Sequence, residues 1–110
     1  MSIIQIPIKP LSVNEAWAGR RFKSKKYKQY EKDIDFLIRN QSEEHGEFNV
    51  IYTFFIKNYG RTDIDNLIKP LQDILVKKGY IEDDRKIVSM TVRKIKSKDE
   101  KIIVEIQKLL

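Results

Sequence analysis

Residues 61–75 read RTDIDNLIKPLQDIL, and they combine an apolar helical stripe with acidic side chains. The stripe recurs at spacings of three and four residues, which predicts an amphipathic helix followed by a left-handed cap at Gly79. Its members are Ile64, Leu67, Ile68, Leu71, Ile74 and Leu75. These acidic residues are clustered in a chain whose formal net charge is +6, so their clustering needs a separate explanation.

The rest of the chain predicts one further helix and four strands around this segment. Apolar and polar residues alternate in three of the strand segments, and good helix formers fill the helix. Residues 48–57 are aromatic and β-branched throughout, which suits a strand covered on both faces. The expected strands are residues 2–9, 48–57, 87–96 and 101–108, and the further helix spans residues 23–44. A loop follows the first strand, and residues 97–100 (SKDE) form a hairpin turn. The predicted class is α/β (α+β), a mixed sheet with helices packed on it in the order β-α-β-α-β-β.

Composition narrows the class of protein. A chain of 110 residues is one domain of ordinary size. Without cysteine it has no disulfide framework, no thiolate nucleophile and no zinc finger. We see no signal peptide, transmembrane span or phosphate-binding glycine loop, so we expect a cytoplasmic protein without membrane contact or nucleotide cofactor. The basic charge makes polyanions the natural partners, a preference that many protein classes share.

The acidic residues suggest a site for a hard cation. On a helix Asp65, Lys69 and Asp73 share one face, with Asp63 just before it. Asp83-Asp84 fall in the next connection. If that connection folds back, three or four carboxylates converge, and oxygen ligands of this kind suit Mg²⁺. A metal there activates water on a phosphodiester, and Lys69 neutralises charge on the phosphate.

Simpler explanations stay open beside the metal site. Asp63 or Asp65 serves as a helix cap, Asp73 pairs with Lys69 or Lys77, and the two later aspartates form a solvated turn. Pro70 lies inside the expected helix, so the regular helix begins near Lys69 or bends there.

The pattern resembles the RusA-type Holliday junction resolvases of bacteria and their phages. The resemblance rests on Asp63-Ile64-Asp65-Asn66, Lys69, Asp73 and Asp83-Asp84, and on Asn14 in the LSVNEAW segment. It spans nearly the whole chain, so residues 1–110 are expected to form a single RusA-like endonuclease domain. It implies a homodimer that resolves four-way DNA junctions in recombination and repair by paired nicks with Mg²⁺, for which Mn²⁺ is a possible substitute.

The same resemblance implies roles for individual residues. Asp63, Asp65, Lys69 and Asp84 match the catalytic set, and Asp83 joins Asp63, Asp65 and Asp84 around the metal. Asn14, Asn66 and Asp73 support the site. Proline at position 70 departs from the small residue expected there.

A basic segment after the first loop is the candidate DNA-contacting surface. Lysines and arginines there track phosphates, and the interleaved Phe22, Tyr27 and Tyr30 offer rings for stacking on bases. Tyr27 and Tyr30 also fit the core stripe of the helix, which is the simpler explanation. The basic residues are Arg20, Arg21, Lys23, Lys25, Lys26 and Lys28.

The sequence therefore predicts a Mg²⁺-dependent endonuclease acting on branched DNA. Two alternatives remain. One is a non-catalytic nucleic-acid-binding protein of ribosomal or architectural type, and the other is a nuclease without preference for four-way junctions.

Overall fold

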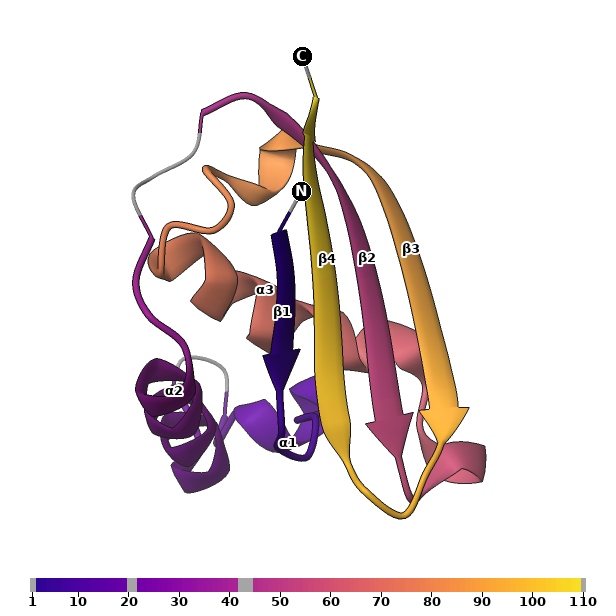
Figure 1. The fold of residues 1–110 in the computed structure, drawn as a ribbon. Coiled ribbons are helices and arrows are strands. Elements are labelled where there is room, and N and C mark those ends of the chain that lie inside the picture. The colour runs from indigo at the N-terminus through magenta and orange to yellow at the C-terminus, as the bar shows by residue number, and fades with distance from the viewer. Residues whose placement is uncertain (1, 20–21, 42–44, 110) are drawn as a thin grey trace.

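The computed structural model describes residues 2–19, 22–41 and 45–109, and its centre is a four-stranded mixed sheet (Figure 1). The strands are β1 (Ser2–Ile6), β2 (Glu47–Ile56), β3 (Ile87–Lys96) and β4 (Lys101–Leu109). Their order across the sheet is β1-β4-β2-β3, in which only β2 and β3 run parallel. The predicted α+β class with a mixed sheet is confirmed.

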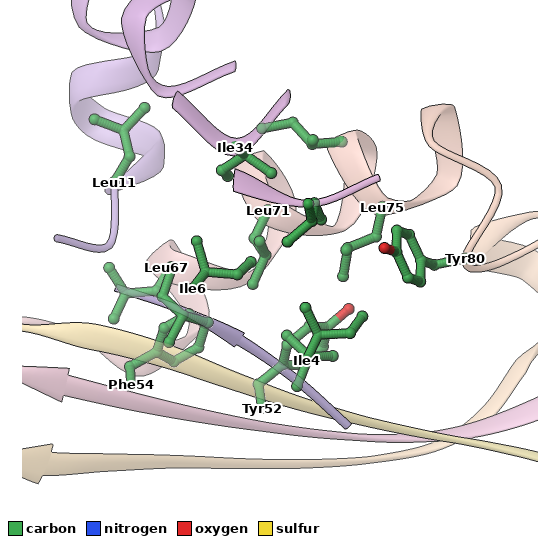
Figure 2. Close-up of a cluster of buried hydrophobic side chains, with 14 of the residues drawn as sticks. Ile4, Ile6, Leu11, Ile34, Tyr52, Phe54, Leu67, Leu71, Leu75 and Tyr80 are labelled. Atoms are coloured by element: carbon green, nitrogen blue, oxygen red, sulfur yellow. The ribbon is translucent and has the colours of Figure 1, made fainter. Parts of the chain in front are cut away.

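Side-chain alternation gives the sheet one buried face. Tyr52 and Phe54 of β2 lie beside Val104 and Ile102 of β4, and all four are fully buried. The helices cover this face, and Figure 2 shows the apolar cluster that fills the space between sheet and helices. Successive residues of a strand point to opposite faces, so the intervening positions lie on the face away from the helices.

The connection at residues 97–100 is not a hairpin, and this expectation was wrong. β3 and β4 do not pair, because β2 lies between them. The amide of Ser97 donates to the carbonyl of Ile56, so the connection passes the end of β2. Burial explains the placement: β4 alternates fully buried residues along its length and suits the interior, whereas β3 leaves Val88 and Met90 exposed and suits an edge.

The helix expected over residues 23–44 is shorter in the structure. α2 (Lys25–Leu37) begins where the Ser24 hydroxyl accepts from the amide of Tyr27. Beyond it, the Tyr80 hydroxyl donates to the carbonyl of Arg39, and the amide of Gln41 donates to the carbonyl of Lys78. These tertiary contacts end the helix despite favourable composition. Residues 42–44 lie outside the described part.

A short helix replaces part of the loop expected after the first strand. α1 (Val13–Ala16) forms where the Ser12 hydroxyl accepts a hydrogen bond from the amide of Asn14. The buried Ala16 anchors it to the core.

The acidic segment folds as two consecutive helical pieces. A 3₁₀ turn, η2 (Ile64–Leu67), precedes α3 (Ile68–Lys77). Pro70 thus falls in the first turn of α3, where an amide would have no partner within the helix. This confirms the late start of the regular helix. Gly79 has φ of +87°, and the amides of Gly79 and Tyr80 donate to the carbonyls of Val76 and Leu75, which is a Schellman cap.

In the residues that the structure describes, no helix has the length and apolar character needed to cross a membrane.

Candidate active site

Asp63 and Asp65 lie in an open hollow of about 550 Å³ at the edge of the sheet. They come from η2, beside the end of β3 and a second 3₁₀ turn, η1 (Tyr59–Arg61), which Figure 1 shows next to the arrowhead of β3. The lining residues are Tyr59, Thr62, Asp63, Ile64, Asp65, Arg93, Lys94 and Ile95. The hollow combines two carboxylates with two cations from β3.

The two carboxylates of this hollow have no partner in the described part of the chain. Asp63 occupies the N-cap position of η2, but its side chain makes no capping hydrogen bond. Asp65 lies in the first turn of the same element and is exposed. The helix-cap explanation therefore does not account for either side chain. Both remain available to an external ligand.

Lys69 bridges two other acidic residues of the predicted set. Its Nζ lies 2.8 Å from Oδ1 of Asp73, one helical turn away, and 3.0 Å from Oδ2 of Asp84. All three side chains are partly exposed. The pKa of Lys69 is raised, because hydrogen bonds first to Asp73 and then to Asp84 favour its ammonium form. Lys69 is therefore a cation held beside a candidate catalytic carboxylate.

Asp83 and Asp84 have different partners although they are neighbours. They open a third 3₁₀ turn, η3 (Asp84–Lys86), and the Asp83 side chain accepts from the amide of Arg85. The Arg85 guanidinium also lies 3.1 Å from Oδ2 of Asp83. These hydrogen bonds to Arg85 lower the pKa of Asp83 to about 2. Asp83 thus caps a turn, whereas Asp84 reaches toward α3.

The donor chemistry of this region suits a hard divalent cation, because aspartate oxygens are its preferred ligands. Fewer acidic side chains come together than the three or four carboxylates that the sequence suggested. Across residues 2–19, 22–41 and 45–109, no three His, Cys, Asp or Glu side chains lie together so that they could hold a metal ion. Asp63 and Asp65 line one hollow, and Asp84 is paired with Lys69.

The two predicted supporting asparagines take separate positions. Asn66 is half-buried in η2, and its backbone amide donates to the carbonyl of Asp63. Asn14 is exposed on α1, which packs beside η2 and α3. Asp73, the third supporting residue, contacts Lys69 directly.

The residues of the basic segment differ in their exposure and in their ion pairs. Lys23 pairs with Glu31 at 2.7 Å and Lys26 with Glu15 at 2.9 Å, whereas Lys25 and Lys28 are exposed and have no ion pair with any described residue. Tyr27 and Tyr30 are buried, as the simpler explanation required. Phe22 is 74% exposed, so it is the ring of this segment that remains open to a base. Arg20 and Arg21 lie outside the described residues.

A second hollow lies between α2 and α3, with a volume of about 470 Å³. Lys28 and Lys32 of α2 face Lys77 of α3 across it. The acidic groups there are neutralised internally, because Glu31 pairs with Lys23 and Asp35 with the buried Lys78. The three remaining lysines extend the basic surface from α2 onto α3.

Four basic residues near these hollows were not among the residues predicted to contact DNA or the metal. Lys32 and Lys77 were absent from the predicted DNA surface because only the packing of α3 against α2 brings them together. Arg93 and Lys94 were missed because the strand containing them is distant in sequence from residues 59–65. A basic pair at the end of a strand was the only local signal.

The chain is similar to known endodeoxyribonucleases. The family described as "Endodeoxyribonuclease RusA" matches residues 7–107. The "Crossover junction endodeoxyribonuclease RusA" of Aquifex aeolicus (strain VF5) is 31% identical over 93 residues, which cover 81% of this chain and 74% of that protein. A protein of the same description from Lactococcus phage r1t is 41% identical over 46 residues, covering 42% of this chain and 35% of that protein. Because the family match extends over nearly all of the sequence, the chain belongs to the RusA family of endodeoxyribonucleases.

Proposed function

We propose that the protein is a divalent-metal-dependent endodeoxyribonuclease that resolves four-way (Holliday) DNA junctions by paired symmetric nicks. Residues 1–110 act as a single endonuclease domain, for which we expect a cytoplasmic location. The observation that carries the proposal is the hollow at Asp63 and Asp65, where two carboxylates without described partners lie beside Arg93 and Lys94. Family membership and the names of the relatives support the same reaction.

Mg²⁺ is the cation we assign to the site, and Mn²⁺ is expected to substitute for it. Asp63 and Asp65 would hold it, with Asp84 and the adjacent Asp83 completing the acidic set. Oδ2 of Asp84 accepts a hydrogen bond from Lys69, and Oδ1 is the oxygen that we assign to the cation. When bound, such a cation supplies an activated water and neutralises phosphate charge.

Lys69 is the residue we assign to charge stabilisation at the phosphate. Its hydrogen bonds to Asp73 and Asp84 raise its pKa further above neutral pH, and more than half of its side chain is exposed. An ammonium fixed beside Asp84 can contact the developing negative charge as the phosphodiester is cleaved. Asp73 holds Lys69 from the following turn of α3 and so acts as a positioning residue. Asn14 and Asn66 are assigned to support of the same region.

The basic surface of α2 is assigned to the arms of the junction. Lys25 and Lys28 are the first candidates for phosphate contact, because neither has an ion pair in the described part of the chain. Lys23 and Lys26 contribute after exchange of their carboxylate partners. Arg20 and Arg21 belong to the same segment of the sequence and complete the proposed surface.

A homodimer would place two such sites on the two symmetric strands of a junction. We assign the contact between the two copies to the face of the sheet that points away from the helices. Its strand positions include Ile51 and Phe55 of β2, Ile95 of β3 and Ile103 of β4. Ile95 is 41% exposed, and no element of the described chain covers this face (Figure 1). A second copy would remove these apolar side chains from water.

The proposal is tested with a synthetic four-way junction and a linear duplex of the same sequence, each strand labelled separately. With Mg²⁺, we expect paired nicks at symmetric positions in two opposite strands of the junction, and intact duplex. Without divalent cation, we expect binding but no cutting. Equal cutting of duplex and junction would indicate a general nuclease. Tight junction binding with no cutting under Mg²⁺ or Mn²⁺ would replace catalysis with an architectural role.

A further inference from the structure

Lys94 makes a dense set of contacts at the rim of the hollow that contains Asp63 and Asp65. Its Nζ donates to the carbonyl of Tyr59 at 2.7 Å and to the carbonyl of Thr62 at 2.8 Å. The same ammonium lies 4.4 Å from the centroid of the Tyr59 ring. Two of its three donors and its charge are thus directed to one short segment of backbone.

This segment leads directly into the two carboxylates. Thr62 is bonded to Asp63, and η1 ends one residue earlier at Arg61. Within the segment, the amide of Arg61 and the hydroxyl of Thr62 both donate to the carbonyl of Asn58. After it, the amide of Asn66 donates to the carbonyl of Asp63. Lys94 ties the segment to the sheet through side-chain hydrogen bonds, because it belongs to β3.

No side chain in the described part of the chain fixes the two carboxylates. Neither the Asp63 nor the Asp65 side chain has a hydrogen bond or ion pair with a described residue, so their placement depends on the backbone that carries them. Removing Lys94 would leave two backbone carbonyls without their donor and would free this backbone. An uncharged side chain would also remove a positive charge beside the two carboxylates, which by itself would favour binding of a cation, so a fall in cation affinity would report the loss of the clamp.

We propose that Lys94 is a positioning residue for the Asp63 and Asp65 carboxylates: it clamps the backbone of residues 59–62 to β3 and thereby sets how this pair presents its oxygens to a divalent cation. Only the second part of this inference, the presentation of the oxygens to a cation, rests on the proposed function. The clamp on the backbone exists without a metal. A residue of this kind does not touch the reacting phosphate. It acts through the orientation of the ligands.

The test compares Lys94→Met, which keeps a long apolar side chain but loses the ammonium, with Lys94→Arg, which keeps a charge and several donors. Lys96→Met is the matched control, because Lys96 lies two positions along β3, is exposed, and its side chain has no hydrogen bond or ion pair with a described residue. Three properties are measured for each full-length protein: hydrogen exchange of the amides in residues 59–66, Mn²⁺ binding by calorimetry without DNA, and thermal unfolding.

The proposal predicts a local effect of Lys94→Met. Amides of residues 59–66 exchange faster while those of β2 and β4 keep their protection, and Mn²⁺ affinity falls by about 10- to 100-fold, as for other residues that orient metal ligands. Lys94→Arg recovers most of both properties, and Lys96→Met matches the wild type. If Lys94→Met loses protection throughout the chain, that variant has unfolded. The local effect is then measured in Lys94→Arg, which is expected to stay folded.

Two results would overturn the proposal. Unchanged exchange in residues 59–66 of Lys94→Met would show that Lys94 does not hold this backbone. Faster exchange with unchanged Mn²⁺ affinity would show that the backbone clamp does not position the carboxylates. If instead the wild type binds no Mn²⁺ at all, the proposed function fails, and the exchange measurement still decides whether the clamp exists.

Discussion

Nζ of Lys69 lies 3.0 Å from Oδ2 of Asp84, and this ion pair joins α3 to the connection that enters β3. Asp73 holds the same ammonium from the other side at 2.8 Å. A lysine between two carboxylates is strongly favoured in its charged form. The region therefore contains a cation before any metal is considered, and that cation is adjacent to one of the proposed metal ligands.

Replacement of Asp73 by asparagine is expected to lower the pKa of Lys69. The hydrogen bond to Asp73 is the largest cause of the raised pKa, and an amide favours the ammonium less. Because the folded-state pKa is raised, this pairing stabilises the fold fully below the ordinary lysine pKa and is lost as pH rises through the higher folded value. In Asp73→Asn this stabilising contribution is therefore smaller, and its loss is complete at lower pH.

This shift is measured by NMR titration of the Lys69 Cε resonance. Asp33→Asn is the matched control, since its carboxylate lies on α2 and accepts from Gln29 rather than from a lysine. An identical titration midpoint in Asp73→Asn and Asp33→Asn would show that Asp73 does not hold the ammonium in solution.

Double replacement of Lys25 and Lys28 by alanine is expected to weaken junction binding without changing the fold. Each phosphate contact that is lost should reduce the slope of log affinity against log salt by about 0.9. The slope is measured by fluorescence anisotropy over a salt series. Lys98→Ala provides the control, because Lys98 is exposed in the connection between β3 and β4. Equal slopes for all three proteins would remove α2 from the DNA surface.

Tyr52→Phe is expected to destabilise the fold by about 1–3 kcal/mol, the usual cost of leaving a buried polar group without its partner. The Tyr52 hydroxyl donates to Oε1 of Gln72 at 2.9 Å, and both side chains are buried. Urea unfolding measures the difference in free energy. Restoration of stability by a second change, Gln72→Leu, would confirm the cause, whereas an unchanged midpoint in Tyr52→Phe would reject it.

A charge on the uncovered sheet face is expected to separate the proposed dimer. Ile103→Glu places a carboxylate at a partly buried position opposite Thr53, and we expect a monomer at concentrations where the wild type is dimeric. Sedimentation velocity reports the mass. Phe36→Glu is the control, because Phe36 is 90% exposed on α2, away from this face. A dimeric Ile103→Glu protein would place the contact elsewhere.

Local chemistry made several features predictable. The helical spacing of the apolar stripe located α3, Pro70 indicated where its regular part begins, and Gly79 marked its cap. Each of these signals acts within a few residues of the feature that it specifies. Alternation in β4 likewise identified its buried face, because strand burial has a fixed period of two. β2 was expected to be covered on both faces, but its alternate positions Asn49, Ile51 and Phe55 are only partly buried.

Long-range pairing set the limit of sequence-based prediction. Nothing within residues 97–100 indicates that β2 separates β3 from β4, so a hairpin was expected where none exists. The contacts that end α2 come from Lys78 and Tyr80, far along the chain. At the candidate site, the acidic residues were found by their spacing, but the roles of Asp83 and Asp84 differ only because Arg85 and Lys69 lie where they do. These assignments need three-dimensional contacts.

The most direct test of the account is single-turnover cleavage of a four-way junction by Asp65→Asn, with Asp33→Asn as control and Mg²⁺ present. Protein is held above the dissociation constant, so that the rate reports chemistry and a parallel anisotropy titration reports binding. We predict that Asp65→Asn binds the junction as tightly as the wild type and cleaves it at least about 100-fold more slowly, beyond the loss typical of a residue that only orients a ligand. Cleavage by Asp65→Asn at the rate of the Asp33→Asn control would contradict the assignment of the metal site to this hollow.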